Sequence, residues 1–392
     1  MPASASDIRL MRRALQLARR AQGRTSPNPM VGAVIARRGL VLGEGYHHQA
    51  GRPHAEIEAL RDAEVRGKKV RGAFLYVTME PCSTHGRTPP CVDAIIDAGI
   101  AKVFVGAVDP NPSHSGRGLR LLRRAGVQVM LMDGVMSDEL IRLNEAFHHW
   151  IVHQTPWVVV KAAMTLDGKI ATRNGESKWI TGTASRALGM RLRAASDAIL
   201  VGVNTVSADD PVLTVRVGAR PAARRLRRFI LDSRGRTPLG ANVFSQGGLE
   251  DTTVVVTRLA PAKRVAALAR RARVWVSPSR DGRVSLPWLM SRMGREGVLQ
   301  LLVEGGGEVG ASFLMGGHAH RVAFFYAPMV LGGRRSRRAV SGEGARDLAS
   351  TLALEGVETK RCGPDLFLTA RVRSNPSEFR KRRSVRKGSV ET

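Results

Sequence analysis

The sequence predicts two α/β domains in one chain, and three observations lead to this prediction. At 392 residues the chain is longer than one typical domain. Short apolar segments with strand character alternate with segments whose apolar residues recur at helical spacing, first before residue 150 and again after it. The composition, 43% hydrophobic and 24% charged, is typical of a globular protein that can bury a core.

The first 150 residues predict a helix, a hairpin and then alternating strands and helices. Ile8, Met11, Leu15 and Ala18 recur at helical spacing, and the turn at 37–39 suits a hairpin. The expected helices cover 8–21, 55–65, 91–98 and 119–125, and the expected strands cover 31–35, 40–43, 74–79, 103–108 and 127–131. This alternation predicts a three-layer α/β domain over residues 1–150.

A boundary is expected near residue 150, where a helix ending at Trp150 meets Thr155-Pro156. A second α/β domain is expected over 151–370, with strands at 157–163, 198–203, 229–231, 253–257, 274–276 and 300–304 and helices at 185–195 and 311–315. Residues 371–392 contain eight basic side chains and almost nothing apolar, so we expect a disordered basic tail there.

The charge and the apolar pattern limit the possible partners. The formal net charge is +29, which suits phosphorylated small molecules and attracts polyanions nonspecifically. Phe379 is the only aromatic residue of the basic tail, so we expect no specific nucleic-acid partner. No run of eighteen apolar residues occurs and no basic segment followed by an apolar run opens the chain, so we expect no membrane association and a cytoplasmic location.

A metal motif is the strongest local signal. The chain has only three cysteines, and two of them, Cys82 and Cys91, follow a His54-Ala55-Glu56 segment. One imidazole and two thiolates supply the three protein ligands that a catalytic zinc site takes while leaving one position open. Glu56, expected at the start of a helix, could move protons between the activated water and a substrate. We therefore predict zinc ligands at His54, Cys82 and Cys91 and a catalytic Glu56.

The spacing of the cysteines departs from the general zinc-deaminase signature. That signature is H-x-E followed by P-C-x-x-C, whereas here eight residues separate Cys82 from Cys91. Two cysteines could also be buried thiols of a core, which is the alternative to a metal site.

The inserted segment between these cysteines closely resembles a known family. The run from Glu80 to Cys91, EPCSTHGRTPPC, resembles the deaminase segment of the bifunctional deaminase/reductases of riboflavin biosynthesis. Further segments that resemble this family are 27–32 (PNPMVG), 43–47 (GEGYH), 109–112 (DPNP), 166–168 (LDG) and 175–181 (GESKWIT). The resemblance runs from about residue 8 to about residue 370.

This resemblance implies a fold and a pair of reactions. The first domain would have a cytidine-deaminase-like fold and would deaminate 2,5-diamino-6-(5-phosphoribosylamino)pyrimidin-4-one to 5-amino-6-(5-phosphoribosylamino)uracil. The second domain, with a dihydrofolate-reductase-like fold, would reduce the ribosyl group to ribityl with NADPH. The family match also assigns the zinc ligands and the proton shuttle to the residues named above, places Asn28 against the substrate's sugar, and implies a homo-oligomer.

The glycines of the second domain indicate a nucleotide site. Gly305, Gly307 and Gly310 follow an expected strand in the pattern G-x-G-x-x-G, whose backbone can approach a pyrophosphate. The acidic residue that would hold a ribose 2′-hydroxyl is missing about twenty positions on, which is compatible with NADP. A simple glycine turn is the alternative.

The resemblance extends these assignments residue by residue. Positions that would contact NADP are Ala163, Trp179, Thr205, Asp209, Ser233, Gly306, Gly307, Glu308, Val309, Gly310, Ala311 and Ser312. Positions that would hold the ribosyl phosphate substrate are Ser177, Arg193, Leu213, Arg216 and Glu304. Arginines suit the second role because they can donate two hydrogen bonds to one phosphate. Lys161 and Asp209 lie in segments from which a proton could be delivered.

Two other functions remain open at this point. The chain could be a deaminase acting on RNA, for example on tRNA, as the +29 charge suggests. It could also be a paralogue that retains only the deaminase activity. The long spacing between Cys82 and Cys91 and the second domain have no role in the RNA hypothesis.

Overall fold

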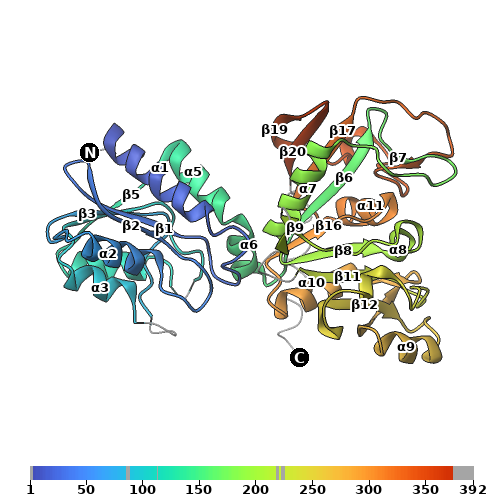
Figure 1. Cartoon of the computed structure of the whole chain (residues 1–392), viewed down its shortest axis with the longest axis horizontal. Helices are drawn as coiled ribbons and strands as arrows, with labels where there is room; N and C mark the ends of the chain where they lie inside the picture. The colour runs from blue at the N-terminus through green and yellow to red at the C-terminus, as the bar shows by residue number, and fades with distance from the viewer. Residues whose placement is uncertain (1–2, 85–88, 113, 218–219, 222–225, 374–392) are drawn as a thin grey trace. The chain divides into compact units, whose positions relative to one another are not determined.

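The computed structural model describes residues 3–84, 89–112, 114–217, 220–221 and 226–373, which form two compact units (Figure 1). The first unit comprises Met1–Pro156 with Gly294–Leu299, and the second comprises Trp157–Met293 with Gln300–Thr392. Among the described residues, no helix has the length and apolarity needed to cross a bilayer.

The first unit is built on a five-stranded sheet of order β2-β1-β3-β4-β5. β1 (Gly32–Arg37) pairs antiparallel with β2 (Leu40–Tyr46) and with β3 (Phe74–Val77). β3, β4 (Lys102–Val105) and β5 (Gln128–Leu131) run parallel, because α3 (Cys91–Asp97) and α4 (Arg117–Arg124) provide the crossovers between them.

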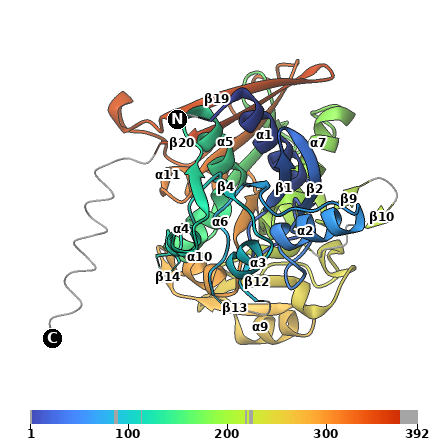
Figure 2. The same cartoon turned by 90° about the vertical axis from the view of Figure 1, so that its left-hand side faces the viewer.

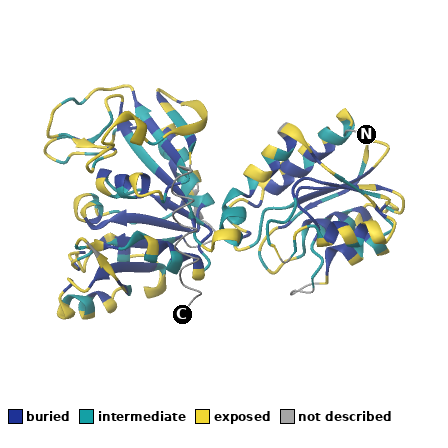
Figure 3. Cartoon of the chain, turned by 180° about the vertical axis from the view of Figure 1, so that it is seen from behind, coloured by how far each residue is buried: buried dark blue, intermediate teal, exposed yellow. Residues whose placement is uncertain are grey.

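Alternation along the strands divides this unit between two cores. Ala33 and Ile35 of β1 belong to a core with α2 (Ala55–Val65), α3 and α4, whereas Val34 and Ala36 belong to a core with α1 (Ala5–Arg19) and α5 (Gly134–Leu143). Since successive strand residues point to opposite faces, this division means that helices cover both faces. The sheet is accordingly buried while the helices keep an exposed side (Figure 3). The predicted three-layer architecture is confirmed. α6 (Glu145–His153) follows these elements.

The second unit is built on a nine-stranded sheet of order β13-β12-β11-β8-β16-β6-β17-β20-β19. The strands from β13 to β17 are parallel, and β20 and β19 are added antiparallel at one edge. The bounds of these strands are β6 Trp157–Thr165, β8 Ala198–Gly202, β11 Arg227–Leu231, β12 Thr252–Thr257, β13 Arg273–Ser277, β16 Gln300–Val303, β17 Arg321–Ala327, β19 Leu354–Cys362 and β20 Asp365–Val372.

Helices and short hairpins connect these strands. The helices are α7 Thr183–Ala195, α8 Val203–Asp209, α9 Ala262–Ala269, α10 Leu286–Arg295 and α11 Gly307–Met315, and three short 3-10 turns cover Asn242–Phe244, Leu249–Asp251 and Leu348–Ser350. The short strands pair as β7 (Lys169–Ala171) with β18 (Arg337–Arg338), β9 (Arg216–Val217) with β10 (Arg220–Pro221), and β14 (Ser279–Arg280) with β15 (Arg283–Val284). α9 packs beside β13 (Figure 2).

The structure corrects several details of the expected elements. α11 begins at Gly307 and not at Ala311; glycine is a weak helix former, but close packing against the Arg338 carbonyl leaves no room for a side chain at this position. Arg371 and Val372, expected in the basic tail, belong to β20, where antiparallel pairing with β17 overrides their composition. Residues 374–392, the rest of that expected tail, lie outside the described residues.

Candidate active sites

Three side chains that are distant in sequence converge at one point of the first unit. His54 precedes α2 as its N-cap residue, Cys91 is the first residue of α3, and Cys82 lies in the extended segment after β3. The Nδ1 atom of His54 lies 3.4 Å from Sγ of Cys82 and 3.3 Å from Sγ of Cys91. All three potential ligand atoms lie within 4.8 Å of one another.

This donor set fits a zinc ion. Zinc bonds of about 2.1 Å to nitrogen and about 2.3 Å to sulfur, at a tetrahedral angle, place the ligand atoms roughly 3.6 Å apart. The measured nitrogen–sulfur distances are close to that value. A hydrogen bond with the Cys91 thiol, aided by His54 and the backbone amide of Cys91, lowers the pKa of Cys82, which favours the thiolate form that binds a metal.

Glu56 lies beside this cluster and is almost fully buried. It stands in the first turn of α2, two residues after His54, and only 3% of its surface is exposed. Burial, assisted by the negative charge of Cys82, raises the pKa of Glu56 to about 7. A carboxyl group with this pKa can both accept and donate a proton near neutral pH.

Glu80 fixes the segment that carries Cys82. One carboxylate oxygen of Glu80 accepts hydrogen bonds from the amides of Asp109 (3.2 Å) and Gly116 (2.9 Å), and the other accepts from the amide of Gly118 (2.9 Å). A Cβ atom at Gly118 would lie 2.3 Å from the carbonyl oxygen of Pro81. The start of α4 therefore lies directly against the Pro81-Cys82 backbone.

A buried histidine orients Asn28, for which the family resemblance predicts a contact with the sugar of the substrate. Nδ1 of His47 donates to the carbonyl oxygen of Pro53 at 3.0 Å, which leaves Nε2 to accept from the Nδ2 amide of Asn28 at 3.1 Å. His47 is 2% exposed, and burial lowers its pKa, so the ring stays neutral and keeps this arrangement.

The second unit contains a pocket of about 2300 Å³ at the carboxyl ends of β6, β8, β11 and β16. Ligands of open α/β sheets bind at this edge. The predicted residues that line the pocket are Ala163, Ser177, Trp179, Arg193, Thr205, Asp209, Leu213, Arg216, Ser233, Glu304, Gly306, Gly307, Glu308, Val309 and Ser312. Gly310 and Ala311 are buried within α11 and do not line it.

The glycine turn between β16 and α11 is packed too closely for side chains. A Cβ atom at Gly307 would lie 2.2 Å from the carbonyl oxygen of Arg338, and one at Gly305 would lie 2.6 Å from Cβ of Val309. The turn therefore presents backbone to the pocket at the start of a nine-residue helix, an arrangement suited to a pyrophosphate.

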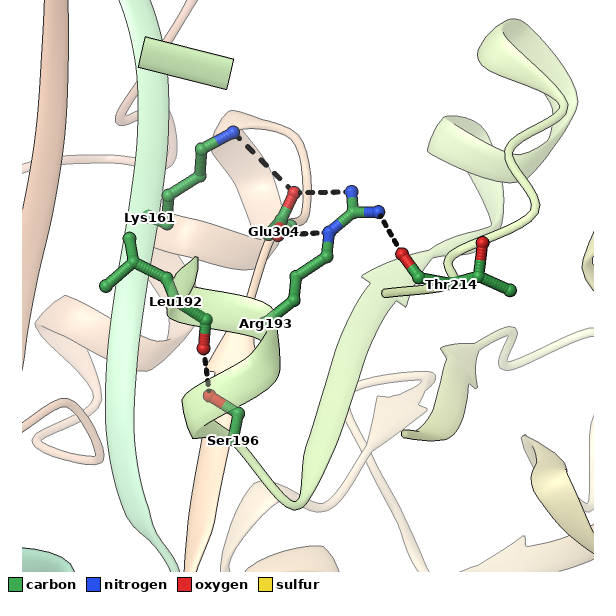
Figure 4. A network of polar contacts seen from close by, with 6 residues as sticks. All are labelled: Lys161, Leu192, Arg193, Ser196, Thr214 and Glu304. Atoms are coloured by element: carbon green, nitrogen blue, oxygen red, sulfur yellow. Dashed lines mark hydrogen bonds and ion pairs between the residues drawn. The ribbon is translucent and has the colours of Figure 1, made fainter. Parts of the chain in front are cut away.

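Glu304, which directly follows β16, is the centre of a charged network in this pocket (Figure 4). Arg193 donates to both carboxylate oxygens, and Nζ of Lys161 lies 3.6 Å from Oε2. Burial opposes ionisation of the carboxyl, but Lys161 and Arg193 outweigh it and lower the pKa of Glu304 to about 2. Nη1 of Arg193 also donates to the carbonyl oxygen of Thr214 at 3.2 Å.

The segment 177–179 lies against α8 at the same pocket. Oγ of Ser177 donates to Oδ1 of Asp209 at 2.9 Å, and Nζ of Lys178 donates to the carbonyl oxygen of Asp209 at 3.1 Å. Trp179 is 70% exposed, and the guanidinium of Arg186 lies 4.8 Å from its ring centre. An exposed, cation-stacked indole on a pocket wall is a flat surface on which an aromatic ligand can stack.

Comparison with known families and proteins identifies both units. Residues 4–107 match the cytidine and deoxycytidylate deaminase zinc-binding region, and residues 156–368 match the RibD C-terminal domain. Over 364 residues the chain is 41% identical to the riboflavin biosynthesis protein RibD of Actinobacillus pleuropneumoniae. This alignment covers 93% of this chain and 94% of that protein. The chain belongs to the RibD family.

RibD proteins of other organisms agree with this assignment. The RibD protein of Escherichia coli K12 is 38% identical to this chain, and the alignment covers 92% of this chain and 98% of the E. coli protein. The solved RibD structure of Acinetobacter baumannii (form 1) has a TM-score of 0.82 at 34% identity, over 94% of this chain and 99% of that chain. The deaminase/reductase structure of Thermotoga maritima has a TM-score of 0.80, also at 34% identity and with the same coverage of both chains.

Membership of the RibD family confirms the predicted fold classes and makes the chain a bifunctional enzyme of riboflavin biosynthesis, with a zinc-dependent deaminase and an NADPH-dependent reductase. Nothing in the comparisons favours an RNA-acting deaminase or a paralogue with one activity.

Sequence reasoning missed the contributions of Glu80, His47 and Arg186. Glu80 could have been noticed because it stands within the EPC motif, whereas only the folded chain brings Arg186 over Trp179.

Proposed function

We propose that His54, Cys82 and Cys91 hold the zinc ion of the deaminase and that Glu56 is its proton shuttle. The observation that carries this proposal is the convergence of one imidazole and two sulfurs beside a buried carboxyl group whose pKa is about 7. The substrate is 2,5-diamino-6-(5-phosphoribosylamino)pyrimidin-4-one, and the products are 5-amino-6-(5-phosphoribosylamino)uracil and ammonia.

Zinc bound at this site supplies a nucleophile at neutral pH by acidifying water. Glu56 accepts a proton from the water that attacks the ring carbon bearing the amino group, and it passes this proton to the adjacent ring nitrogen. It then takes the proton of the new hydroxyl group and delivers it to the amino nitrogen as the carbon–nitrogen bond breaks, so that ammonia leaves and a carbonyl remains. Asn28, held by His47, positions the sugar of the substrate.

In the second unit, the predicted NADPH contacts come from β6 and from the segments that follow β11, β8 and β16, which are neighbouring strands of the sheet. The glycine turn and α11, contributing Gly306 to Ser312, receive the pyrophosphate, with Gly310 and Ala311 acting through the helix backbone. Ala163 on β6 and the exposed Trp179 lie at the end where the nicotinamide stacks, and Thr205 and Asp209 of α8 line the wall beside the turn. Ser233 lies on the β11 side of the turn.

Glu304 and Lys161 act on the sugar of the second substrate. NADPH supplies a hydride to the sugar carbon C1′. The ammonium group of Lys161 delivers a proton to the ring oxygen as the C1′–O bond opens, and the ion pair with Glu304 holds this lysine at the pocket. Ser177 and Leu213 complete the wall that holds the substrate.

The two predicted phosphate-binding arginines have different surroundings. The guanidinium of Arg193 is directed at Glu304 and Thr214, so its role is to position Glu304. Arg216 is exposed at the pocket wall, and we assign the phosphate contact to it.

A coupled assay tests both halves on the intact zinc-loaded protein. The diaminopyrimidine phosphate should release ammonia and then consume NADPH, with one NADPH oxidised for each ammonia released. Lys161→Met should abolish NADPH oxidation while ammonia release continues. Ammonia release without NADPH oxidation by the unmodified protein would contradict the reductase half, and NADPH oxidation without ammonia release would contradict the deaminase half. A homo-oligomer and a cytoplasmic location stay predictions.

A further inference from the structure

Asp365 is a buried carboxylate that lies outside the pocket of the second unit. It is the first residue of β20, is 2% exposed and does not line the pocket. Its Oδ2 atom accepts a hydrogen bond of 2.8 Å from the backbone amide of Gly182. Among the residues that the structure describes, no lysine or arginine is ion-paired with Asp365. Because burying a charge is costly unless it is compensated, the contact with Gly182 must contribute to holding this carboxylate in place.

Gly182 is the N-cap residue of α7, and it has no side chain with which to cap that helix. The first turn of α7 contains no acidic residue either. The free amides at a helix N-terminus and the positive end of the helix dipole both favour a nearby carboxylate. Asp365, 183 positions away in the sequence, supplies it. The turn between β19 and β20 packs at the same point, since a Cβ atom at Gly363 would lie 3.7 Å from Cβ of Ala184.

α7 presents one face to the pocket. Arg186, Met190 and Arg193 recur at helical spacing and line the pocket. Within α7, which the structure describes in full, only Ser185 and Gly189 are buried, so apolar packing contributes little to holding this helix. The polar contacts at the ends of α7 therefore decide where its two arginines lie.

Arg186 lies near the start of α7 and holds the segment that carries Trp179. Its Nη1 atom donates to the carbonyl oxygen of Thr181 at 2.7 Å, and its Nη2 atom donates to the hydroxyl of Thr183 at 3.0 Å. The same guanidinium lies 4.8 Å from the ring centre of Trp179. A displacement of the start of α7 would therefore move Arg186 and change the orientation of the indole on the pocket wall.

We propose that Asp365 is a positioning residue of the reductase, which fixes the start of α7 and thereby the orientation of Arg186 and Trp179 in the pocket. The carboxylate touches neither the substrate nor the cofactor. This inference rests on the proposed function of the pocket as the reductase site. It gives the β19–β20 hairpin, at the edge of the sheet, a role in the reductase reaction through its contact with Gly182.

Steady-state kinetics of both activities on the full-length zinc-loaded protein test this inference. Asp365→Ala removes the acceptor of the Gly182 amide. With 5-amino-6-(5-phosphoribosylamino)uracil as substrate, kcat for NADPH oxidation should fall by about tenfold or more, because hydride transfer depends on the alignment of the two reactants. The KM of this substrate should stay within about threefold, since the proposed phosphate contact, Arg216, does not belong to α7. Ammonia release, which depends on the first unit, is the internal control and should stay within about twofold.

Two further variants separate positioning from a general loss of stability. Asp365→Asn retains a side-chain oxygen that can accept from the Gly182 amide, so kcat should recover to within about threefold of the unmodified protein. Ala370→Gly is the matched control, because Ala370 is a fully buried residue of the same strand. It destabilises β20 and retains the Gly182 contact, so kcat should stay within about twofold. If Asp365→Ala does not fold, Asp365→Leu, which fills the space without an acceptor, is measured in its place.

A double-mutant cycle tests whether Asp365 acts through Arg186. Arg186→Met removes the guanidinium that contacts Thr181 and Trp179, and it should lower kcat of the reductase by about tenfold. Both changes disturb the same contacts. The double variant D365A/R186M should therefore lose at most about twofold more than the more impaired single variant.

Four results would overturn the inference. Unchanged kcat in Asp365→Ala, or an equal loss in Ala370→Gly, would make Asp365 a residue of the fold alone. A failure of Asp365→Asn to recover kcat would mean that the hydrogen bond to Gly182 is not what the reductase requires. Losses that multiply in the double variant would exclude an effect through Arg186. The proposed function of the pocket fails separately, namely if Lys161→Met leaves NADPH oxidation unchanged.

Discussion

Arg193 donates two parallel hydrogen bonds to Glu304, from Nε to Oε1 at 2.8 Å and from Nη2 to Oε2 at 3.0 Å. Both side chains are largely buried, with 16% and 10% of their side-chain surface exposed. The two hydrogen bonds keep the Glu304 carboxylate ionised and fix its orientation in the pocket. Glu304 can therefore hold the ammonium group of Lys161 in one position.

The first prediction concerns the pH dependence of stability. The folded-state pKa of Glu304, about 2, lies below its ordinary value of 4.5. Ionised Glu304 therefore stabilises the second unit above about pH 4.5, and this contribution disappears between about pH 4.5 and 2 as the carboxylate takes up a proton. We expect Glu304→Gln to lower the free energy of unfolding by at most about 3 kcal/mol at pH 6 and by roughly half of that or less at pH 3, in urea titrations followed by tryptophan fluorescence. A difference independent of pH would contradict the assigned charge state.

The second prediction concerns the metal. Cys82→Ser should lower the zinc content and abolish ammonia release, because it removes one of three proposed ligands. NADPH oxidation on 5-amino-6-(5-phosphoribosylamino)uracil should survive. Cys362→Ser is the matched control, since Cys362 is a buried free cysteine in the second unit. Loss of both activities in Cys82→Ser would show that the two chemistries are not separable.

The third prediction concerns Glu80, whose two oxygens accept three backbone N–H groups. In Glu80→Gln one of these oxygens becomes an NH₂ group facing an N–H donor, at a cost of about 1–3 kcal/mol. Because Glu80 holds the Cys82 segment, we also expect zinc affinity to fall by roughly tenfold or more. Competition with a zinc chelator measures this, with the exposed Glu64→Gln as control. Unchanged zinc affinity would mean that Cys82 is positioned without this carboxylate.

The fourth prediction concerns the glycine turn. A methyl group at Gly307 would overlap the carbonyl oxygen of Arg338, so Gly307→Ala should displace the start of α11 and weaken NADPH binding by about tenfold or more. Gly189→Ala is the contrasting change, because Gly189 lies within α7 with nothing within 4 Å of the added atom. It should raise stability by about 0.5–1 kcal/mol with NADPH affinity unchanged. Equal NADPH affinity in both variants would show that the turn does not contact the cofactor.

The regular elements were largely predictable, and the exceptions have physical causes. The predicted helix at 55–65, which was expected to begin after Pro53, coincides with α2. α5 was missed as a separate helix, and α8, α9, α10, β19 and β20 were not predicted. The residues of β19 are mostly exposed, so no buried face marks that strand in the sequence. Its pairing with β20 across the sheet edge is a long-range contact that no local pattern encodes.

The sequence by itself determined which chemistry the first unit can perform, because His54, Glu56, Cys82 and Cys91 are residue types with few other reasons to occur together. It also determined the family, through a dozen motif residues in one order. Only the tertiary structure decided what each charged group does. Arg193 binds Glu304 and Asp365 binds the amide of Gly182, because the partners of each side chain come from segments distant in the chain. Many arginines contribute to the net charge of +29, and only the folded chain shows which of them line the pocket.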